Sequence, residues 1–172
     1  MKNRKRGFSL VELLIVLAVI AALIATITPV ALNAIRKAKA TQVAQNLKTL
    51  ASAIENAAYV NGVNDALLIK NSAAGGTTKI SLDDIGRDIN ESDYGFTYYL
   101  DADTNKYVVV VYFNKAASVD DTLVAEVLRG ATTTDLLSSY TPSTISGADV
   151  EDNDGAAAGS EAIYYRIEFD LY

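Results

Sequence analysis

The first third of the chain contains one long apolar run. From Leu13 to Ile35 there are 23 consecutive uncharged residues, and between Phe8 and Ile35 the single charged residue is Glu12. At a rise of about 1.5 Å per residue, a helix over this run is about 34 Å long, enough to cross a hydrocarbon core of about 30 Å. The pattern therefore predicts a helix that can span a membrane. The alternative, a buried helix of a soluble core, is seldom apolar on all of its faces over this length.

After Ile35 the apolar residues occupy one helix face. They recur at intervals of three and four residues, at Ala40, Val43, Leu47, Leu50, Ile54 and Ala57. This period predicts an amphipathic helix, and Asn61-Gly62 supplies its C-terminal stop signal. We therefore expect one helix over residues 8–61, with a membrane or filament core at 8–35 and an amphipathic half at 36–61. A coiled-coil dimer is the alternative explanation for the apolar face.

Residues 62–172 predict a β-rich head. Two runs of β-branched and aromatic residues, 96–100 and 107–113, flank turn-forming residues at 101–105, which is typical of a hairpin. A last strand alternates, and one face of it carries Ile163, Tyr165, Ile167, Phe169 and Leu171. We expect an antiparallel sheet of three or more strands with one face on the helix. The predicted fold class is α+β, a long N-terminal helix packed against a small antiparallel sheet.

Capping signals predict two short helices in the head. The two candidate capping boxes are Ser81 with Asp84 and Ser118 with Asp121. The first predicts a helix to about Ile89, and the second predicts a helix that Gly130 ends. The connecting residues 62–80 predict a loop with one short element at 66–69, and residues 132–146 predict a polar, irregular segment.

Composition removes several chemistries. The chain of 172 residues has no Cys and no His, so it holds no disulfide, no thiol nucleophile, no Ser-His-Asp triad and no ordinary zinc site. The sequence also has no phosphate-binding glycine loop. We therefore expect neither an enzyme nor a cofactor.

Charge is unevenly distributed along the chain. Residues 1–7 hold four basic and no acidic side chains, residues 60–172 hold seven basic and 19 acidic ones, and the whole chain carries −6. Because the head is acidic, we expect no nucleic-acid partner. Three bases follow the apolar run, at Arg36, Lys37 and Lys39, so the excess of positive charge before the run only slightly favours a cytoplasmic N-terminus.

Glu12 is the most informative residue of the apolar run. An ionised carboxylate inside hydrocarbon costs several kcal/mol unless a cation pairs with it. No Lys or Arg occurs between Gly7 and Arg36, so no side chain one or two turns along the helix supplies that cation. A cut between Gly7 and Phe8 would create an α-amino group four residues before Glu12, and the amine of a neighbouring copy is then a candidate partner. The alternative is a Glu12 that is protonated or reaches the membrane interface.

The start of the chain resembles a known processing signal. Behind the basic leader, residues 7–16 read GFSLVELLIV, which is similar to the prepilin-peptidase motif of bacterial type IV pilins and type II secretion pseudopilins. The resemblance runs from the leader to about Tyr59 and leaves the head uncovered. It implies that Gly7 precedes the scissile bond, that residues 1–7 are a cleaved leader, and that Phe8 is the N-methylated first residue of the mature chain.

The resemblance also implies how the chain assembles. Glu12 would neutralise the terminal amine of a neighbouring copy in the filament. The implied partners are other copies of the chain, the prepilin peptidase, the pilus assembly machinery and, before assembly, the inner membrane. The implied locations are the inner membrane for the precursor and a filament on the cell surface for the mature protein.

Pro29 interrupts the helix pattern inside the apolar run. Because it lacks an N–H, the carbonyl of Ala25 loses its helix partner, and the ring crowds that carbonyl, which favours a kink or local unwinding. The hydroxyls of Thr26 and Thr28 are expected to bond to carbonyls one turn back in this apolar setting. Many pilins also carry a proline here, but Ala21 stands where many of them have Gly, which makes unwinding less assured.

Two acidic loops are candidates for calcium, a cation that takes oxygen ligands. The first holds Asp101, Asp103 and Asn105. Lys106 stands at the Gly position of such a loop and Tyr112 at the position of its bidentate Glu, which favours a plain hairpin turn. The second holds Asp149, Glu151, Asp152 and Asp154. The resemblance favours this second set, because major pseudopilins as a family bind calcium in a late loop.

These observations favour a structural function, that of a type IV pilus subunit that polymerises through its apolar helix. A type II secretion pseudopilin of a short periplasmic filament is the second hypothesis. A membrane-tethered adhesin or DNA-uptake minor pilin is the third, and it is disfavoured because the acidic head shows no basic aromatic groove.

Overall fold

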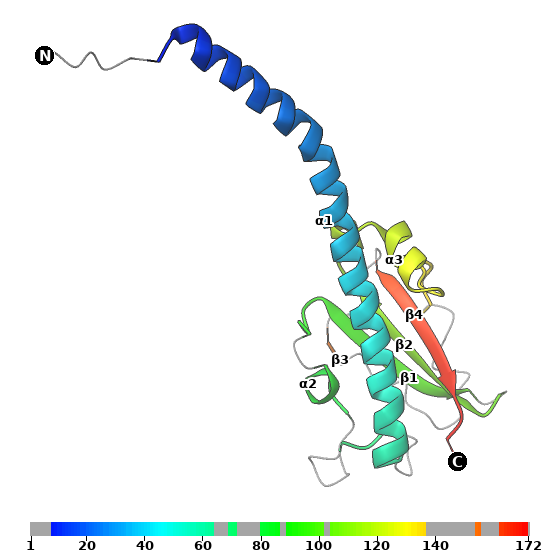
Figure 1. The fold of residues 1–172 in the computed structure, drawn as a ribbon. Coiled ribbons are helices and arrows are strands. Elements are labelled where there is room, and N and C mark those ends of the chain that lie inside the picture. Colours follow the sequence, from blue (N-terminus) through cyan, green and yellow to red (C-terminus); the bar gives the residue numbers. More distant parts are fainter. Residues whose placement is uncertain are drawn as a thin grey trace, which may run out of the picture. The chain divides into compact units, whose positions relative to one another are not determined.

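The computed structural model describes residues 8–63, 69–71, 80–86, 89–101, 104–136, 154–155 and 162–171. In chain order its elements are α1 (Leu10–Asn61), α2 (Leu82–Ile85), β1 (Tyr94–Asp101), β2 (Lys106–Phe113), the 3₁₀ helix η1 (Ala116–Ser118), α3 (Asp121–Val127), β3 (Asp154–Gly155) and β4 (Ile163–Phe169) (Figure 1). The chain divides into two compact units, Met1–Ala38 and Lys39–Tyr172, which we describe one at a time. The predicted α+β class is confirmed, with one long N-terminal helix and a small antiparallel sheet.

The long helix α1 begins and ends close to the predicted residues. It starts at Leu10, two residues after the expected start, and ends at Asn61 as expected. Gly62 follows with φ +71°, and its N–H donates to the carbonyl of Ala58 over 3.0 Å. A left-handed residue is most easily glycine, and this bond satisfies one of the last carbonyls of the helix, so the predicted stop signal is confirmed.

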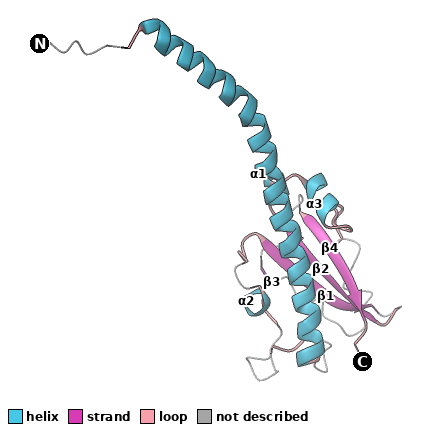
Figure 2. Ribbon diagram, in the orientation of Figure 1, coloured by secondary structure: helices cyan, strands magenta, loops and turns pink. Residues whose placement is uncertain are grey.

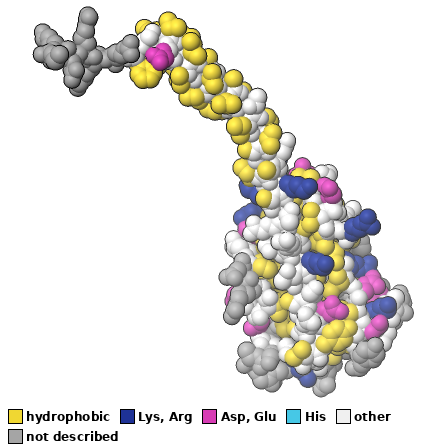
Figure 3. Space-filling view, in the orientation of Figure 1, with side chains coloured by type: hydrophobic (Ala, Val, Ile, Leu, Met, Phe, Trp, Pro, Cys, Tyr) yellow, Lys and Arg dark blue, Asp and Glu magenta, His cyan; other side chains and the backbone are white. Residues whose placement is uncertain are grey.

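In the unit Met1–Ala38, the described part of α1 leaves its apolar side chains uncovered. Every described side chain from Phe8 to Ala38 is exposed. The exposed fraction of the large hydrophobic side chains runs from 45% at Ile20 to 81% at Leu10, and Figure 3 shows the hydrophobic side chains along this segment. An apolar surface of this extent marks a segment that another apolar phase covers.

In the unit Lys39–Tyr172, the predicted apolar face of α1 is buried. Its buried members are Ala40, Val43, Ala44, Leu47, Leu50, Ala51, Ile54 and Ala58. They form one core cluster with residues of β1, β2 and β4, and the side-chain amide of Asn46 donates to the hydroxyl of Tyr94 over 3.0 Å. Because the chain's own sheet covers this face, the coiled-coil alternative is wrong for these residues.

The sheet has four antiparallel strands in the order β3-β1-β2-β4 (Figure 2). In the hairpin, the register runs from Tyr94 opposite Phe113 to Asp101 opposite Lys106. β4 pairs with β2, while the two-residue β3 pairs with Gly95 and Phe96 of β1. The predicted hairpin and last strand are confirmed. β3 was not predicted, because two paired residues leave no periodic signal in the sequence.

Both faces of the sheet are buried, although only one was expected to be. Phe96, Tyr98, Val109 and Val111 belong to the core on the α1 side. The opposite side has a second cluster made of Tyr99, Val108, Val110, Tyr112, Ala162 and Tyr164, with Leu136 packed against it. The unbroken apolar run of residues 107–113 is typical of a strand buried on both sides, and this signal was missed.

The first capping box is confirmed, but its helix is shorter than predicted. The Asp84 carboxylate accepts hydrogen bonds from the N–H of Ser81 over 2.9 Å and from its hydroxyl over 2.6 Å. α2 nevertheless ends at Ile85 and does not reach Ile89. Gly86 donates its N–H to the carbonyl of Leu82 and closes the last turn, because a glycine here disfavours continuation of the helix.

The second predicted capping box is wrong. Asp120 is the N-cap of α3, and its carboxylate accepts from the hydroxyl of Thr122 over 2.6 Å and from the N–H of Leu123 over 3.4 Å. Ser118 instead ends η1 and donates its hydroxyl to the carbonyl of Lys115. Because Ser118 belongs to the 3₁₀ helix, α3 begins later than predicted, at Asp121. Gly130, with φ +98°, follows the helix end as expected.

Acid is expected to weaken the cap of α2. The hydrogen bond from the Ser81 hydroxyl lowers the pKa of Asp84 below its ordinary value of 3.8, against a smaller opposing effect of burial. A carboxyl whose pKa is lowered by folding adds stability above its unfolded-state pKa and loses that contribution as pH falls through the folded-state pKa. The difference in the free energy of unfolding between wild type and Asp84→Asn should therefore be present at about pH 7 and shrink as the pH falls below 3.8. The difference should be small, because the group is exposed. Urea unfolding at neutral pH and at several acidic pH values measures this, and a difference that does not change with pH would contradict it.

Gly95 is expected to be intolerant of any side chain. A Cβ placed there would lie 2.6 Å from the Cζ and hydroxyl oxygen of Tyr112 on the paired strand, and Tyr112 is fully buried. Gly95→Ala should therefore lower the free energy of unfolding by about 1–3 kcal/mol, the usual cost of overpacking. Urea unfolding of the detergent-solubilised chain measures this value. In the Tyr112→Phe background the cost should be smaller, because one of the clashing atoms is gone; an equal cost in both backgrounds argues against the clash.

Candidate functional site

The predicted processing site lies at the N-terminal end of α1. Gly7 lies outside the described residues, and Phe8 and Ser9 precede the first helical residue, Leu10. Phe8 is 76% exposed, and the carbonyl of Ser9 accepts from the N–H of Leu13 over 3.2 Å. The described side of the expected scissile bond is therefore exposed chain outside the helix, where a peptidase can reach it.

Glu12 lies in the first turn of α1. A carboxylate is favoured there, because the unpaired N–H groups at a helix start carry partial positive charge. The side chain is exposed, and within the described part of the chain no basic group forms an ion pair with it. A charge-neutralising partner for Glu12, where one exists, therefore comes from elsewhere than the described side chains of the same molecule.

The surface around Glu12 is hydrophobic enough to enter a membrane. The most apolar 18-residue window of α1 has a mean hydropathy of 2.9, and none of it is buried. α1 is therefore long and apolar enough to cross a bilayer by length and composition. This segment can lie in lipid or pack against other apolar helices, and both settings make an unpaired carboxylate costly.

Pro29 lies inside α1, and the helix continues on both sides of it. The Thr26 hydroxyl donates to the carbonyl of Leu23 over 2.9 Å, and the Thr28 hydroxyl donates to the carbonyl of Ile24 over 2.7 Å. These bonds satisfy two hydroxyl groups within the helix, as expected for an apolar setting. Unwinding at Pro29 stays a prediction for the assembled state.

The calcium candidates are only partly described. Asp103, Asp149, Glu151 and Asp152 lie outside the described residues. Asp101 ends β1, and Asn105 has φ +56° and donates its N–H to the carbonyl of Asp101 over 2.7 Å, which is a hairpin turn. Asp154 lies in β3 opposite Phe96. Within the described ranges no group of three or more acidic side chains is placed to hold a metal, so calcium binding stays a prediction.

Titratable tyrosines in the sheet are held in the neutral form. Burial raises the pKa of the Tyr112 hydroxyl, and the neighbouring Tyr164 adds to this effect. Burial also raises the pKa of Tyr94, Tyr107 and Tyr164. These hydroxyls are therefore neutral, and none is poised to exchange a proton near neutral pH.

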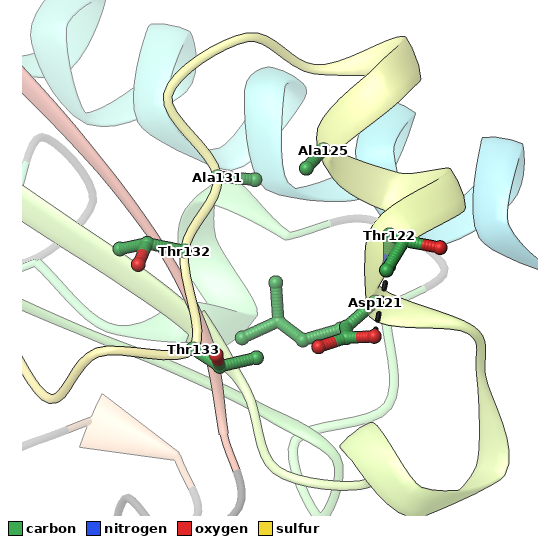
Figure 4. A pocket seen from close by; sticks show the side chains of 7 residues that line it. Asp121, Thr122, Ala125, Ala131, Thr132 and Thr133 are labelled. Carbon is green, nitrogen blue, oxygen red and sulfur yellow. Dashed lines mark hydrogen bonds between the residues drawn. The ribbon is translucent and has the colours of Figure 1, made fainter.

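A pocket of about 230 Å³ lies beside α3 (Figure 4). Its lining residues are Asp121, Thr122, Ala125, Ala131, Thr132, Thr133 and Ile163. The Asp121 carboxylate accepts from the N–H of Thr122 over 2.8 Å, and the Thr132 hydroxyl accepts from the N–H of Thr134 over 3.0 Å. These polar groups serve the local turns, and the described lining contains no pairing of a nucleophile with a base.

Comparison with known families bears on the N-terminal end of the chain. Residues 2–28 match the family model described as the prokaryotic N-terminal methylation motif. The chain carries this methylation motif. It is characteristic of type IV pilins and pseudopilins, so the resemblance noted in residues 7–16 is confirmed. No curated protein matches the chain, and no solved structure matches it.

The methylation motif and the apolar helix together indicate the class of precursor to which the chain is similar. The motif supports a type IV pilin-like or pseudopilin precursor and implies processing by the prepilin peptidase, and the apolar helix fits a membrane anchor. The match ends at residue 28 and does not extend into the head.

Processing is expected to depend on Gly7. The mature protein should begin at an N-methylated Phe8, and Gly7→Val should leave a chain that still begins at Met1, because a branched side chain replaces the glycine before the scissile bond. Mass spectrometry of the N-terminal peptide from purified membranes measures both. Asn3→Ala, which alters the leader away from the bond, serves as the matched control and should be cleaved. A wild-type protein that begins at Met1 would refute this assignment.

Proposed function

We propose that the protein is a structural subunit of a type IV pilus filament. The leader, residues 1–7, is removed, Phe8 is methylated, and the mature chains polymerise through the apolar part of α1. The observation that carries this proposal is the exposed apolar surface from Phe8 to Ile35, which holds one carboxylate, Glu12, and begins inside the methylation motif of residues 2–28.

The apolar surface supplies the cohesion of the filament. Moving apolar side chains out of water is worth about 25 cal/mol per Å², and the described apolar side chains of this segment are all uncovered in the single chain. Packing of copies against one another covers them without the polar backbone being exposed, because a helix satisfies its own N–H and C=O groups.

The Glu12 carboxylate supplies the register of the filament. No basic side chain lies between Gly7 and Arg36, so the new amine of Phe8 on a neighbouring copy is the nearest cation that processing creates. Removing one partner of an ion pair in an apolar setting strongly destabilises the assembly, because it leaves an uncompensated charge. Copies that slide out of register therefore lose the pair and are disfavoured.

The proposed cellular path follows from this arrangement. The precursor lies in the inner membrane, the prepilin peptidase processes it there, and the pilus assembly machinery moves it into a surface filament with the acidic heads outward. The subunit acts by assembly, without catalysis and without a required cofactor or nucleic-acid partner.

A pseudopilin of type II secretion is the second candidate, because pseudopilins share the methylation motif. Electron microscopy separates the two candidates, since long filaments on the native cell surface favour the pilus. A requirement for calcium in folding favours the pseudopilin.

Loss of the Glu12 carboxylate is expected to stop assembly and to leave membrane insertion intact. Glu12→Ala removes the partner of the incoming amine but makes the helix more apolar, so the subunit should still fractionate with membranes. Filament yield in electron micrographs should fall by about tenfold or more, since loss of one partner of a buried ion pair costs about 3–5 kcal/mol.

Glu55→Ala is the matched control for this variant, because Glu55 lies in the amphipathic half of α1. It should assemble like wild type. Normal filaments from Glu12→Ala would refute the register role.

A further inference from the structure

A second pocket lies between the last turns of α1 and α2, within the unit Lys39–Tyr172. Its volume is about 490 Å³, within the usual range of binding pockets. The apolar lining consists of Ala53, Ala57, Val60, Ile80 and Ile85, and the polar lining consists of Asn56, Asn61, Asn71 and Asp84. Asp84 is the one charged residue among the lining residues.

The Asp84 carboxylate is held in place by one of its two oxygens. Oδ2 accepts from the N–H and the hydroxyl of Ser81 and, over 2.5 Å, from the side-chain amide of Asn71. Among the described residues, no donor bonds to Oδ1 and no basic side chain forms an ion pair with Asp84. The hydrogen bonds lower the pKa of Asp84, so the pocket carries a fixed negative charge at neutral pH and favours a cationic group.

The lining fits a long basic side chain. Ala53 and Ala57 are small, and with Ile85 they form an apolar wall against which a methylene stem can lie while its charged end meets the carboxylate. Asn56 and Asn61 at the same pocket are neutral, so they add hydrogen-bonding capacity without competing for the cation.

Lys39 is a basic residue of this chain that matches the pocket. It lies on α1, its side chain is exposed, and within the described ranges no acidic group forms an ion pair with it. Lys39 and Ala57 are 18 residues apart on one helix, which corresponds to about 27 Å. The Lys39 of the same molecule therefore does not reach the pocket, whereas that of another molecule can.

We propose that the pocket beside Asp84 receives Lys39 from a second copy of this chain. The inference rests on the proposed function, since it needs copies that assemble in parallel. It adds a contact between heads and predicts that contacting copies are displaced by about 27 Å along the helix axis. In the filament, Glu12 sets the axial register between the apolar parts of neighbouring helices. The contact between Asp84 and Lys39 sets the register between neighbouring heads.

Disulfide cross-linking tests the contact directly. The chain has no Cys, so introduced cysteines are the only thiols. Asn56 is exposed and lines the pocket, and residues 39 and 56 of one molecule are about 26 Å apart on the helix, far beyond the roughly 4.4–6.8 Å between Cα atoms that a disulfide allows. Lys39→Cys with Asn56→Cys, in filaments sheared from cells and mildly oxidised, should give a ladder of covalent oligomers on a non-reducing gel.

Lys39→Cys with Glu126→Cys is the matched control, because Glu126 is exposed on α3 away from the pocket lining. It should stay monomeric on the gel. Filaments that give no ladder with the pocket pair, or an equal ladder with the control pair, overturn the contact and leave the proposed function standing. A wild-type chain that forms no filament overturns the proposed function itself.

A double-mutant cycle tests the same contact without cysteines. Lys39→Gln and Asp84→Asn should each lower filament yield by about threefold. The double variant should be no worse than Asp84→Asn alone, because the ion pair that Lys39→Gln removes is already lost in that variant. Each loss should shrink as salt is raised. If the losses of the two single variants add up in the double variant, the contact does not exist. This test still applies if the cysteine variants assemble poorly.

Discussion

A single carboxylate on an otherwise apolar helix is the constraint that organises this protein. Water solvates Glu12 in the isolated chain, but every environment that covers the surrounding hydrophobic side chains removes that water. The charge then needs a cation, and the apolar run contains none. The same feature that makes the helix insert or assemble therefore makes its assembly selective, because only arrangements that bring a cation to Glu12 avoid the cost of a buried charge.

The apolar side chains of α1 are exposed in one unit and buried in the other. In the described part of Met1–Ala38 the apolar side chains are on all faces of the helix and remain exposed. In Lys39–Tyr172 the apolar side chains of α1 form one stripe, and the sheet covers it. A stripe can be buried by one sheet within the same molecule, whereas a helix that is apolar all round needs lipid or several neighbouring helices. The change in pattern near residue 36 thus separates two kinds of apolar surface. One is buried when the single chain folds, and the other is covered only by lipid or by other molecules.

Local capping signals predicted the two short helices of the head with unequal success. The box of Ser81 and Asp84 formed as expected. The box of Ser118 and Asp121 failed because Asp120, two residues after Ser118, caps α3 and Ser118 belongs to the 3₁₀ helix. Capping energies are about 0.5–2 kcal/mol, so adjacent candidates differ by less than the tertiary contacts that choose between them.

The sequence by itself determined the processing motif, the apolar run with its lone charge, the end of α1, the hairpin and the last strand. Each depends on residues close together in the chain or on a period that repeats along it. Only the tertiary structure decided that the sheet is buried on both faces, that β3 pairs with β1, and that Asp84 stands over a pocket beside α1. These features join residues far apart in sequence, and their energy comes from packing that local patterns do not encode.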